Sequence, residues 1–114
     1  MIRGVVVLAA GLSVVAAQTP LSSPVRGLTG DTALARLYDT ILDADFDAVP
    51  GRLRQTCPPA EPEFCLVLTA VAIWWEISLD RDNRRHDARF SAAVEAAIAS
   101  SETWTQREPQ RAEA

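Results

Sequence analysis

The chain has 114 residues, 48% of them hydrophobic, and a formal net charge of −4 at pH 7. This length allows one small domain at most. All 11 basic residues are arginine and the largest basic cluster is the pair Arg84–Arg85, so the composition argues against nucleic acid or an anionic membrane as a partner and favours proteins, peptides or small molecules.

The first 17 residues predict a secretory signal peptide. Met1 to Arg3 provides a positive start, Val5 to Val15 is an apolar run, and small residues precede Gln18. The alternative is a retained membrane anchor, but the apolar run is short for a membrane span. We therefore expect cleavage near Ala17 and an exported protein, periplasmic or secreted, with no membrane attachment afterwards.

Residues 18–30 are rich in Pro, Ser, Thr and Gly, and this composition predicts a flexible linker. A helical pattern begins at Asp31 and continues to about Ala44. Its apolar residues recur at i, i+3, i+4, i+7 and i+8: Leu34, Leu37, Tyr38, Ile41 and Leu42. Thr29 or Asp31 is the expected N-cap of this helix.

A shorter helix is predicted from Ala48 to Thr56. Asp47 would be its N-cap, and Pro50 would lie in its first turn, where the missing N–H is not needed. Gly51 weakens this helix, which must therefore depend on its neighbours for stability.

Cys57 and Cys65 are separated by seven residues, of which three are proline. An even number of cysteines in an exported protein predicts a disulfide, and this spacing is not that of a CxxC redox pair or a zinc ribbon. The bridge would join the end of the second helix to the start of the next one. Two reduced, buried thiols are the main alternative.

The stretch from Phe64 to Leu79 has one charged residue, Glu76, and its apolar residues lie on every side of a helical wheel. Such a helix is normally buried by neighbours on several sides. At about 24 Å it is short for a bilayer span, so we interpret it as a central core helix that starts near Glu61 or Glu63 and ends near Asp80. Three flanking helices are too few to surround it, which predicts an uncovered apolar face and self-association.

After a polar loop, a last helix is predicted to begin between residues 84 and 87 and to end at Arg107. Its packing stripe follows helical spacing: Phe90, Ala93, Val94, Ala97, Ile98, Ser101 and Trp104. The small alanines in the stripe would let another helix approach closely. Glu108–Pro109 ends the helix, because the residue before proline disfavours the α region.

His86 and Glu76 are the residues considered for catalysis. His86, the single histidine, could act as a base oriented by Asp87, but no Ser or Cys nucleophile is placed for it, so we interpret it as a solvated residue at a helix start. Glu76 is expected to reach solvent or to pair with Arg36 or Arg81. The sequence contains no phosphate-binding loop, haem motif or calcium loop. We therefore expect no enzyme activity, no cofactor and no metal site.

Aromatic side chains are the candidates for contact with a partner. Trp74 and Trp75 are adjacent on the central helix and point about 100° apart, so at most one of them faces a given groove. At least one is expected in the core. The candidate interaction surface consists of Trp75, Phe90 and Trp104, although Trp104 also belongs to the packing stripe of the last helix.

The C-terminal part of the chain resembles a tetratricopeptide-repeat protein. Pro109, followed after two residues by Ala112-Glu113-Ala114, is similar to the junction between two such repeats, and the stretch from Ala72 to Ala114 resembles the N-terminal part of exported bacterial members of this family. The loop between the last two helices is longer than in the family, and Trp104 occupies a position where the family has a small residue. The resemblance implies that residues 108–114 are the start of a further repeat that is cut short.

The helical patterns predict an all-α domain at residues 31–107, with four helices in two antiparallel hairpins. The resemblance implies an incomplete helical-repeat scaffold that binds a protein or peptide without catalysis, since helix pairs in such arrays need neighbours to bury their apolar surface. Two other interpretations stay open. One is a small self-contained secreted module held by its disulfide, acting as an inhibitor or sensor, and the other is the non-catalytic start of a larger enzyme.

Overall fold

The computed structural model describes residues 28–111. The predicted signal peptide at residues 1–17, residues 18–27 of the predicted linker and residues 112–114 of the predicted further repeat lie outside the described residues.

The described residues form helices and turns, with no strand among them. The order is α1 (Asp31–Leu42), the short 3-10 helix η1 (Phe46–Ala48), α2 (Val49–Thr56), α3 (Pro62–Leu79), the 3-10 helix η2 (Arg84–His86) and α4 (Asp87–Arg107). The prediction of an all-α chain with four helices is therefore confirmed.

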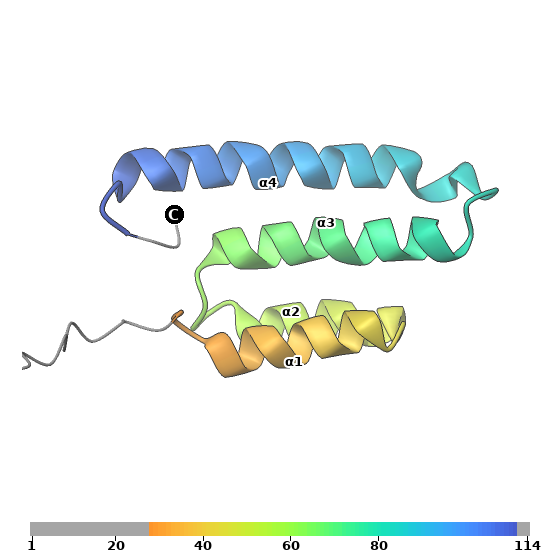
Figure 1. Ribbon diagram of the computed structural model, residues 1–114, viewed down its shortest axis with the longest axis horizontal. Helices are drawn as coiled ribbons and strands as arrows, with labels where there is room; N and C mark the ends of the chain where they lie inside the picture. Colours follow the sequence, from red (N-terminus) through yellow and green to blue (C-terminus); the bar gives the residue numbers. More distant parts are fainter. Residues whose placement is uncertain (1–27, 112–114) are drawn as a thin grey trace, which may run out of the picture.

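The helices form two consecutive hairpins, and α3 lies in the middle. In Figure 1, α4 runs along one side of α3, and α1 and α2 lie on the opposite side. The buried core joins α1 and α2 to α3 through four residues, namely Leu37, Ile41, Val49 and Ala72. The partly buried side chains of Phe46, Leu53, Leu68 and Trp75 pack around them. α4 makes its helix contacts with α3, so its outer face has no neighbour within the described residues.

The predicted N-caps are wrong for both helices of the first hairpin. The residue before α1 is Gly30, whose φ of 76° is left-handed and whose carbonyl accepts from the Leu34 N–H at 2.9 Å, while Asp31 instead accepts from the Thr32 N–H at 2.6 Å. Asp47 lies inside η1, which runs directly into α2, so that the residue preceding α2 is Ala48. Both helices therefore begin from a backbone turn, without a hydrogen bond from a capping side chain.

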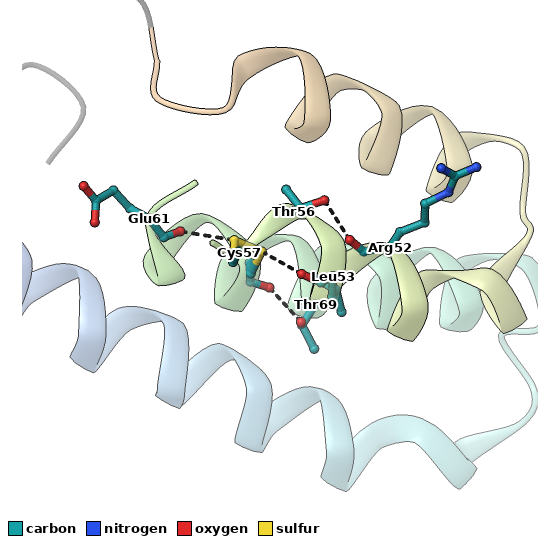
Figure 2. The surroundings of a disulfide bond; sticks show 7 residues. Arg52, Leu53, Thr56, Cys57, Glu61 and Thr69 are labelled. Carbon is teal, nitrogen blue, oxygen red and sulfur yellow. Dashed lines mark hydrogen bonds between the residues drawn. A yellow bond between two sulfur atoms is a disulfide. The ribbon is translucent and has the colours of Figure 1, made fainter. Parts of the chain in front are cut away.

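The two cysteine sulfur atoms lie 1.96 Å apart, at disulfide distance, and the Cα atoms are 6.3 Å apart. Cys57 ends α2 and Cys65 lies in the first turns of α3, so the bond links the two hairpins as the sequence predicts. Figure 2 shows the neighbouring helix ends held by local hydrogen bonds: the Thr56 hydroxyl donates to the Arg52 carbonyl at 2.7 Å, and the Thr69 hydroxyl donates to the Cys65 carbonyl at 2.7 Å.

By length and composition alone, α3 could cross a membrane, and it is the one such helix in the described part of the chain. Within the fold it packs on helices at both sides and carries two glutamates in ion pairs, which is the environment of a core helix. Nevertheless, full burial is limited to four of its 18 residues: Glu63, Ala70, Ala72 and Ile73. The remaining apolar surface of α3 is therefore only partly covered, and part of it forms the site described next.

Candidate functional site

An open apolar groove of about 940 Å³ runs between α3 and α4. From α3 it is lined by Val67, Ala70, Val71 and Trp74. From α4 it is lined first by the apolar residues Phe90, Val94, Ala97 and Ile98, and then by the more polar residues Ser101, Glu102, Thr105 and Gln106. We call this feature the α3/α4 groove.

The groove exists because small residues lie where the two helices touch and large ones lie beside them. Ala70 and Ala97 are buried at 8% and 7% exposure. Because their side chains are small, the axes of the two helices can come close. Val67, Trp74 and Ile98 stand on either side of this seam and remain 41%, 49% and 54% exposed. Contact of large apolar side chains with water is unfavourable, so a partner that covers these side chains would gain binding free energy.

The outer rim of the groove is acidic along α4. Glu102 lines the groove, and Glu95, seven residues earlier, lies on the same side of the helix because seven residues make about two turns. Both side chains are exposed, and neither forms an ion pair within residues 28–111. The nearby arginines are engaged elsewhere: Arg89 pairs with Glu76 and Arg107 pairs with Glu63.

The three aromatic residues predicted to form the interaction surface lie in three different environments. Phe90 lines the α3/α4 groove. Trp75 packs against the buried core, and it is its neighbour Trp74 that enters the groove; the two rings meet edge to face at 5.1 Å. Trp104 is 2% exposed and therefore cannot belong to an interaction surface in this fold.

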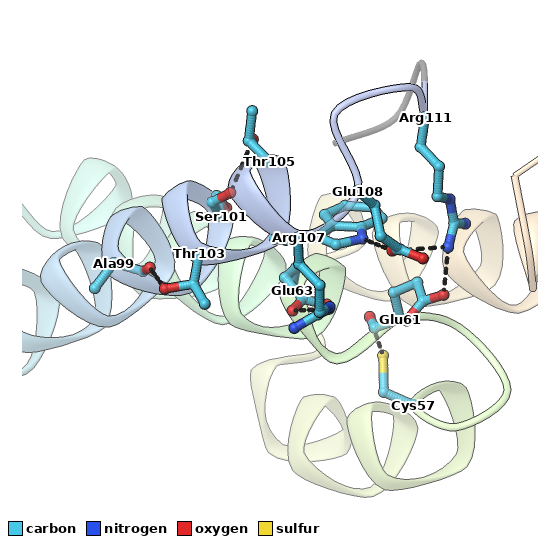
Figure 3. A network of polar contacts seen from close by, with 11 residues as sticks. Cys57, Glu61, Glu63, Ala99, Ser101, Thr103, Thr105, Arg107, Glu108 and Arg111 are labelled. Carbon is cyan, nitrogen blue, oxygen red and sulfur yellow. Dashed lines mark hydrogen bonds and ion pairs between the residues drawn. The ribbon is translucent and has the colours of Figure 1, made fainter.

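Trp104 is buried because the start of α3 and the residues after α4 close over it. Its ring meets the ring of Phe64 at 5.4 Å, nearly perpendicular, and its indole N–H donates to Glu108. The guanidinium of Arg111 lies 5.3 Å from the ring centroid and donates to Glu61 at 2.9 Å. Figure 3 shows Glu61, Glu108 and Arg111 gathered at one end of the α3–α4 hairpin. Residues 108–111 thus fold back on the hairpin.

Glu63 forms a second contact at the same end, which the sequence analysis did not identify. Its side chain is 6% exposed, one carboxylate oxygen lies 3.5 Å from Arg107, and the other oxygen is buried with no hydrogen-bond partner among residues 28–111. The sequence signal was limited to an acidic residue in the first turn of α3, where the helix dipole favours negative charge. That signal does not reveal that α4 covers the carboxylate.

At the other end of the hairpin, Glu76 and His86 are neighbours rather than separate surface residues. The predicted partners of Glu76, Arg36 and Arg81, are replaced by Arg89 and by the His86 Nε2, each at 3.3 Å. The side chain of His86 is 14% exposed, so the prediction of a solvated histidine is wrong. η2 turns the chain back on itself here and brings the start of α4 against the end of α3.

Glu76, His86 and Arg89 also line a polar pocket of about 560 Å³, together with residues from η1 and α2. Among the described residues, the lining of this pocket contains no Ser, Thr or Cys. Its Glu76 carboxylate forms an ion pair with Arg89 and lies beside the His86 imidazole, whose Nε2 accepts from the Arg85 Nε–H at 2.9 Å. This arrangement fits an ion-pair cluster that closes the hairpin. Within the described residues, no group of three or more His, Cys, Asp or Glu side chains is placed to hold a metal ion.

Comparisons of the chain with known protein families, with curated proteins and with solved structures found no match.

Proposed function

We propose that this protein is an exported, non-catalytic helical scaffold that binds a protein or peptide in the α3/α4 groove. The observation that carries the proposal is the groove itself, with Val67, Trp74 and Ile98 half exposed along it. Its lining follows α4 from Phe90 to Gln106, about 24 Å at 1.5 Å per residue, and the lining is apolar from Phe90 to Ile98. A shallow channel of that length suits an extended or helical segment better than a compact small molecule, which prefers an enclosed cavity.

A repeat architecture similar to tetratricopeptide repeats is the proposed context for this groove. The order of two consecutive hairpins and the small residues between α3 and α4 support it. The short α2 and the buried Trp104 differ from a regular repeat, so the α3–α4 hairpin would be an atypical or terminal one. The uncovered outer face of α4 is where a further hairpin would stack.

Export is proposed from the N-terminal signal pattern and from the cysteine pair at disulfide distance, which suits an oxidising compartment. Intact mass measurement of the exported product tests both features. We expect a chain that begins at Gln18 and is lighter by two hydrogens than its reduced form. A chain that retains Met1, or one with two free thiols, would contradict the proposal.

A self-contained secreted module is the second candidate, favoured by one observation. Arg111 folds back onto Trp104 and Glu61, and Gly30 packs against Ala60, so both ends of the described chain are tied to the hairpins. Such closure suits a small inhibitor or sensor that works without further repeats. In this case the α3/α4 groove would still be the binding surface.

The binding function can be tested by selecting peptides from a random displayed library on the immobilised chain from Gln18 to Ala114. The variant Ile98→Glu places a charge in the groove at a residue that is 54% exposed, so the fold should tolerate it. The matched control is Leu42→Glu on α1, at a residue that is 50% exposed and outside the groove lining.

We expect the selected peptides to lose binding to the Ile98→Glu variant and to keep it on the Leu42→Glu variant. Peptides that bind the natural chain and both variants equally, or a library that yields no binding peptide, would contradict the proposal. Self-association that Ile98→Glu abolishes would also contradict it, because the groove would then serve a second copy of this chain.

A further inference from the structure

We propose that the α3/α4 groove receives an amphipathic helix that carries basic residues along one flank. This inference rests on the proposed function and specifies the chemistry of the partner. It follows from the shape of the groove floor, from the charges on one rim and from the absence of charge on the other.

The floor of the groove is shaped for a third helix. Ala70 and Ala97 at the seam leave a shallow channel between two larger ridges, and helices pack by placing the ridge of one into the groove of another. The length of about 24 Å corresponds to four to five helical turns. A partner with apolar residues at i, i+3, i+4 and i+7 would cover Val67, Trp74 and Ile98 together.

The two rims differ in charge. On the α4 side, Glu95 and Glu102 project from the same face, two turns or about 10.5 Å apart, and neither forms an ion pair with an arginine of the described chain. On the α3 side, the lining consists of neutral residues, including Val67 and Trp74. A seated helix would therefore be stabilised by Lys or Arg at two positions seven residues apart, both on its α4-facing flank.

The same charges argue against two other occupants. A second copy of this chain, which has a net charge of −4, would bring its own acidic rim to the site. The apolar segment Val5–Val15 of the chain itself contains no charged residue that could pair with Glu95 or Glu102. A basic partner helix satisfies both the apolar floor and the acidic rim.

The test uses three synthetic peptides with one apolar stripe and different residues at the two flank positions: lysine, glutamine or glutamate. Binding to the chain from Gln18 to Ala114 is measured by isothermal titration calorimetry at low and high salt. We expect the lysine peptide to bind about fivefold to tenfold more tightly than the glutamine peptide, as two exposed ion pairs would give. The glutamate peptide should bind most weakly, and the differences should shrink as salt screens the charges.

Variants of the chain identify the residues responsible. In the double variant Glu95→Gln and Glu102→Gln the preference for lysine should disappear, whereas apolar binding should remain. The control, Asp39→Asn with Asp43→Asn, removes the same charge from exposed residues of α1 and should leave the preference intact.

Two results would overturn the inference in different ways. If all three peptides bind equally and Ile98→Glu prevents binding, the charge argument is wrong and the proposed function stands. If no peptide binds, or if the Ile98→Glu variant binds the peptides as tightly as the natural chain does, both the inference and the proposed function fail.

Discussion

Two glycines of the described chain have opposite surroundings. Gly30 has a φ of 76°, and a Cβ there would lie 2.9 Å from the Cβ of Ala60 and 3.0 Å from its backbone nitrogen. Gly51 lies inside α2, where the nearest atom to an added Cβ is a flexible Arg54 nitrogen at 3.9 Å. The first glycine is required by backbone conformation and close packing, and the second only weakens a helix.

We predict that Gly30→Ala lowers the free energy of unfolding by about 1–3 kcal/mol, because it combines left-handed strain with a backbone contact. Gly51→Ala is the matched control and should raise that free energy by about 0.5–1 kcal/mol through better helix propensity. Urea unfolding followed by circular dichroism measures both. A neutral Gly30→Ala would show that α1 does not begin against the loop that precedes α3.

The contact between Glu63 and Arg107 gives a second prediction for single residues. Arg107→Ala should destabilise the chain by about 1–2 kcal/mol, below the 3–5 kcal/mol of a fully buried pair, because Arg107 is 55% exposed. Arg107→Lys, which keeps the charge, should cost less.

A double-mutant cycle in urea separates this ion pair from lost packing. In the Glu63→Gln background the same Arg107→Ala change should have little effect, since no buried charge is left unpaired. Equal losses in both backgrounds would mean that the arginine acts only through its aliphatic stem.

At the scale of elements, the disulfide joins two hairpins that also share the buried core of Leu37, Ile41, Val49 and Ala72. It closes a loop with a sequence separation of eight, between the end of α2 and the first turns of α3. Replacing both cysteines by alanine should therefore lower the free energy of unfolding by about 2–3 kcal/mol. The measurement is the urea midpoint with and without a reducing agent. Reduction should lower the midpoint of the natural chain and leave that of the double variant unchanged; equal midpoints for the natural chain in both conditions would contradict the prediction.

The helices could be predicted from the sequence because their signals are local. The spacing of Leu34, Leu37 and Ile41 identified α1, and Glu108–Pro109 marked the end of α4. The cap of α1 could not be predicted, because Gly30 lies against Ala60, which is 30 residues later in the chain. The cap of α2 could not be predicted, because η1 runs directly into α2 and places Asp47 inside the turn. The ion pair of Glu63 was missed and the arginine partner of Glu76 was wrongly assigned for a similar reason, since both partners come from a different helix.

The groove itself depends on how α3 and α4 are rotated about their axes, which sequence periodicity does not determine for α3. Its apolar residues lie on all sides, so the pattern gave no reason to prefer Trp74 over Trp75 as the exposed ring. For α4, the predicted packing stripe correctly included Ala97 and Trp104, which are buried, whereas Ile98 is 54% exposed and lines the groove. The positions of these side chains depend on contacts that form only when the chain folds back on itself, and sequence periodicity does not show such contacts.

At the scale of the whole molecule, the protein is a central apolar helix covered on one side by the α1–α2 hairpin and on the other by α4 alone. The side with a single covering helix retains the α3/α4 groove. We therefore propose that binding occurs on this face and that the charged clusters at both ends of the α3–α4 hairpin are structural.

The most direct test follows the indole N–H signals of the three tryptophans by two-dimensional NMR while the lysine peptide is added. Trp74 lies in the groove, Trp75 touches its ring from the core side, and Trp104 is buried at the hairpin end. Single Trp→Phe variants assign the signals. We expect the Trp74 signal to shift most and the Trp104 signal to stay in place. A shift confined to Trp104, or binding of the peptide with no shift of any tryptophan signal, would contradict the proposed binding site.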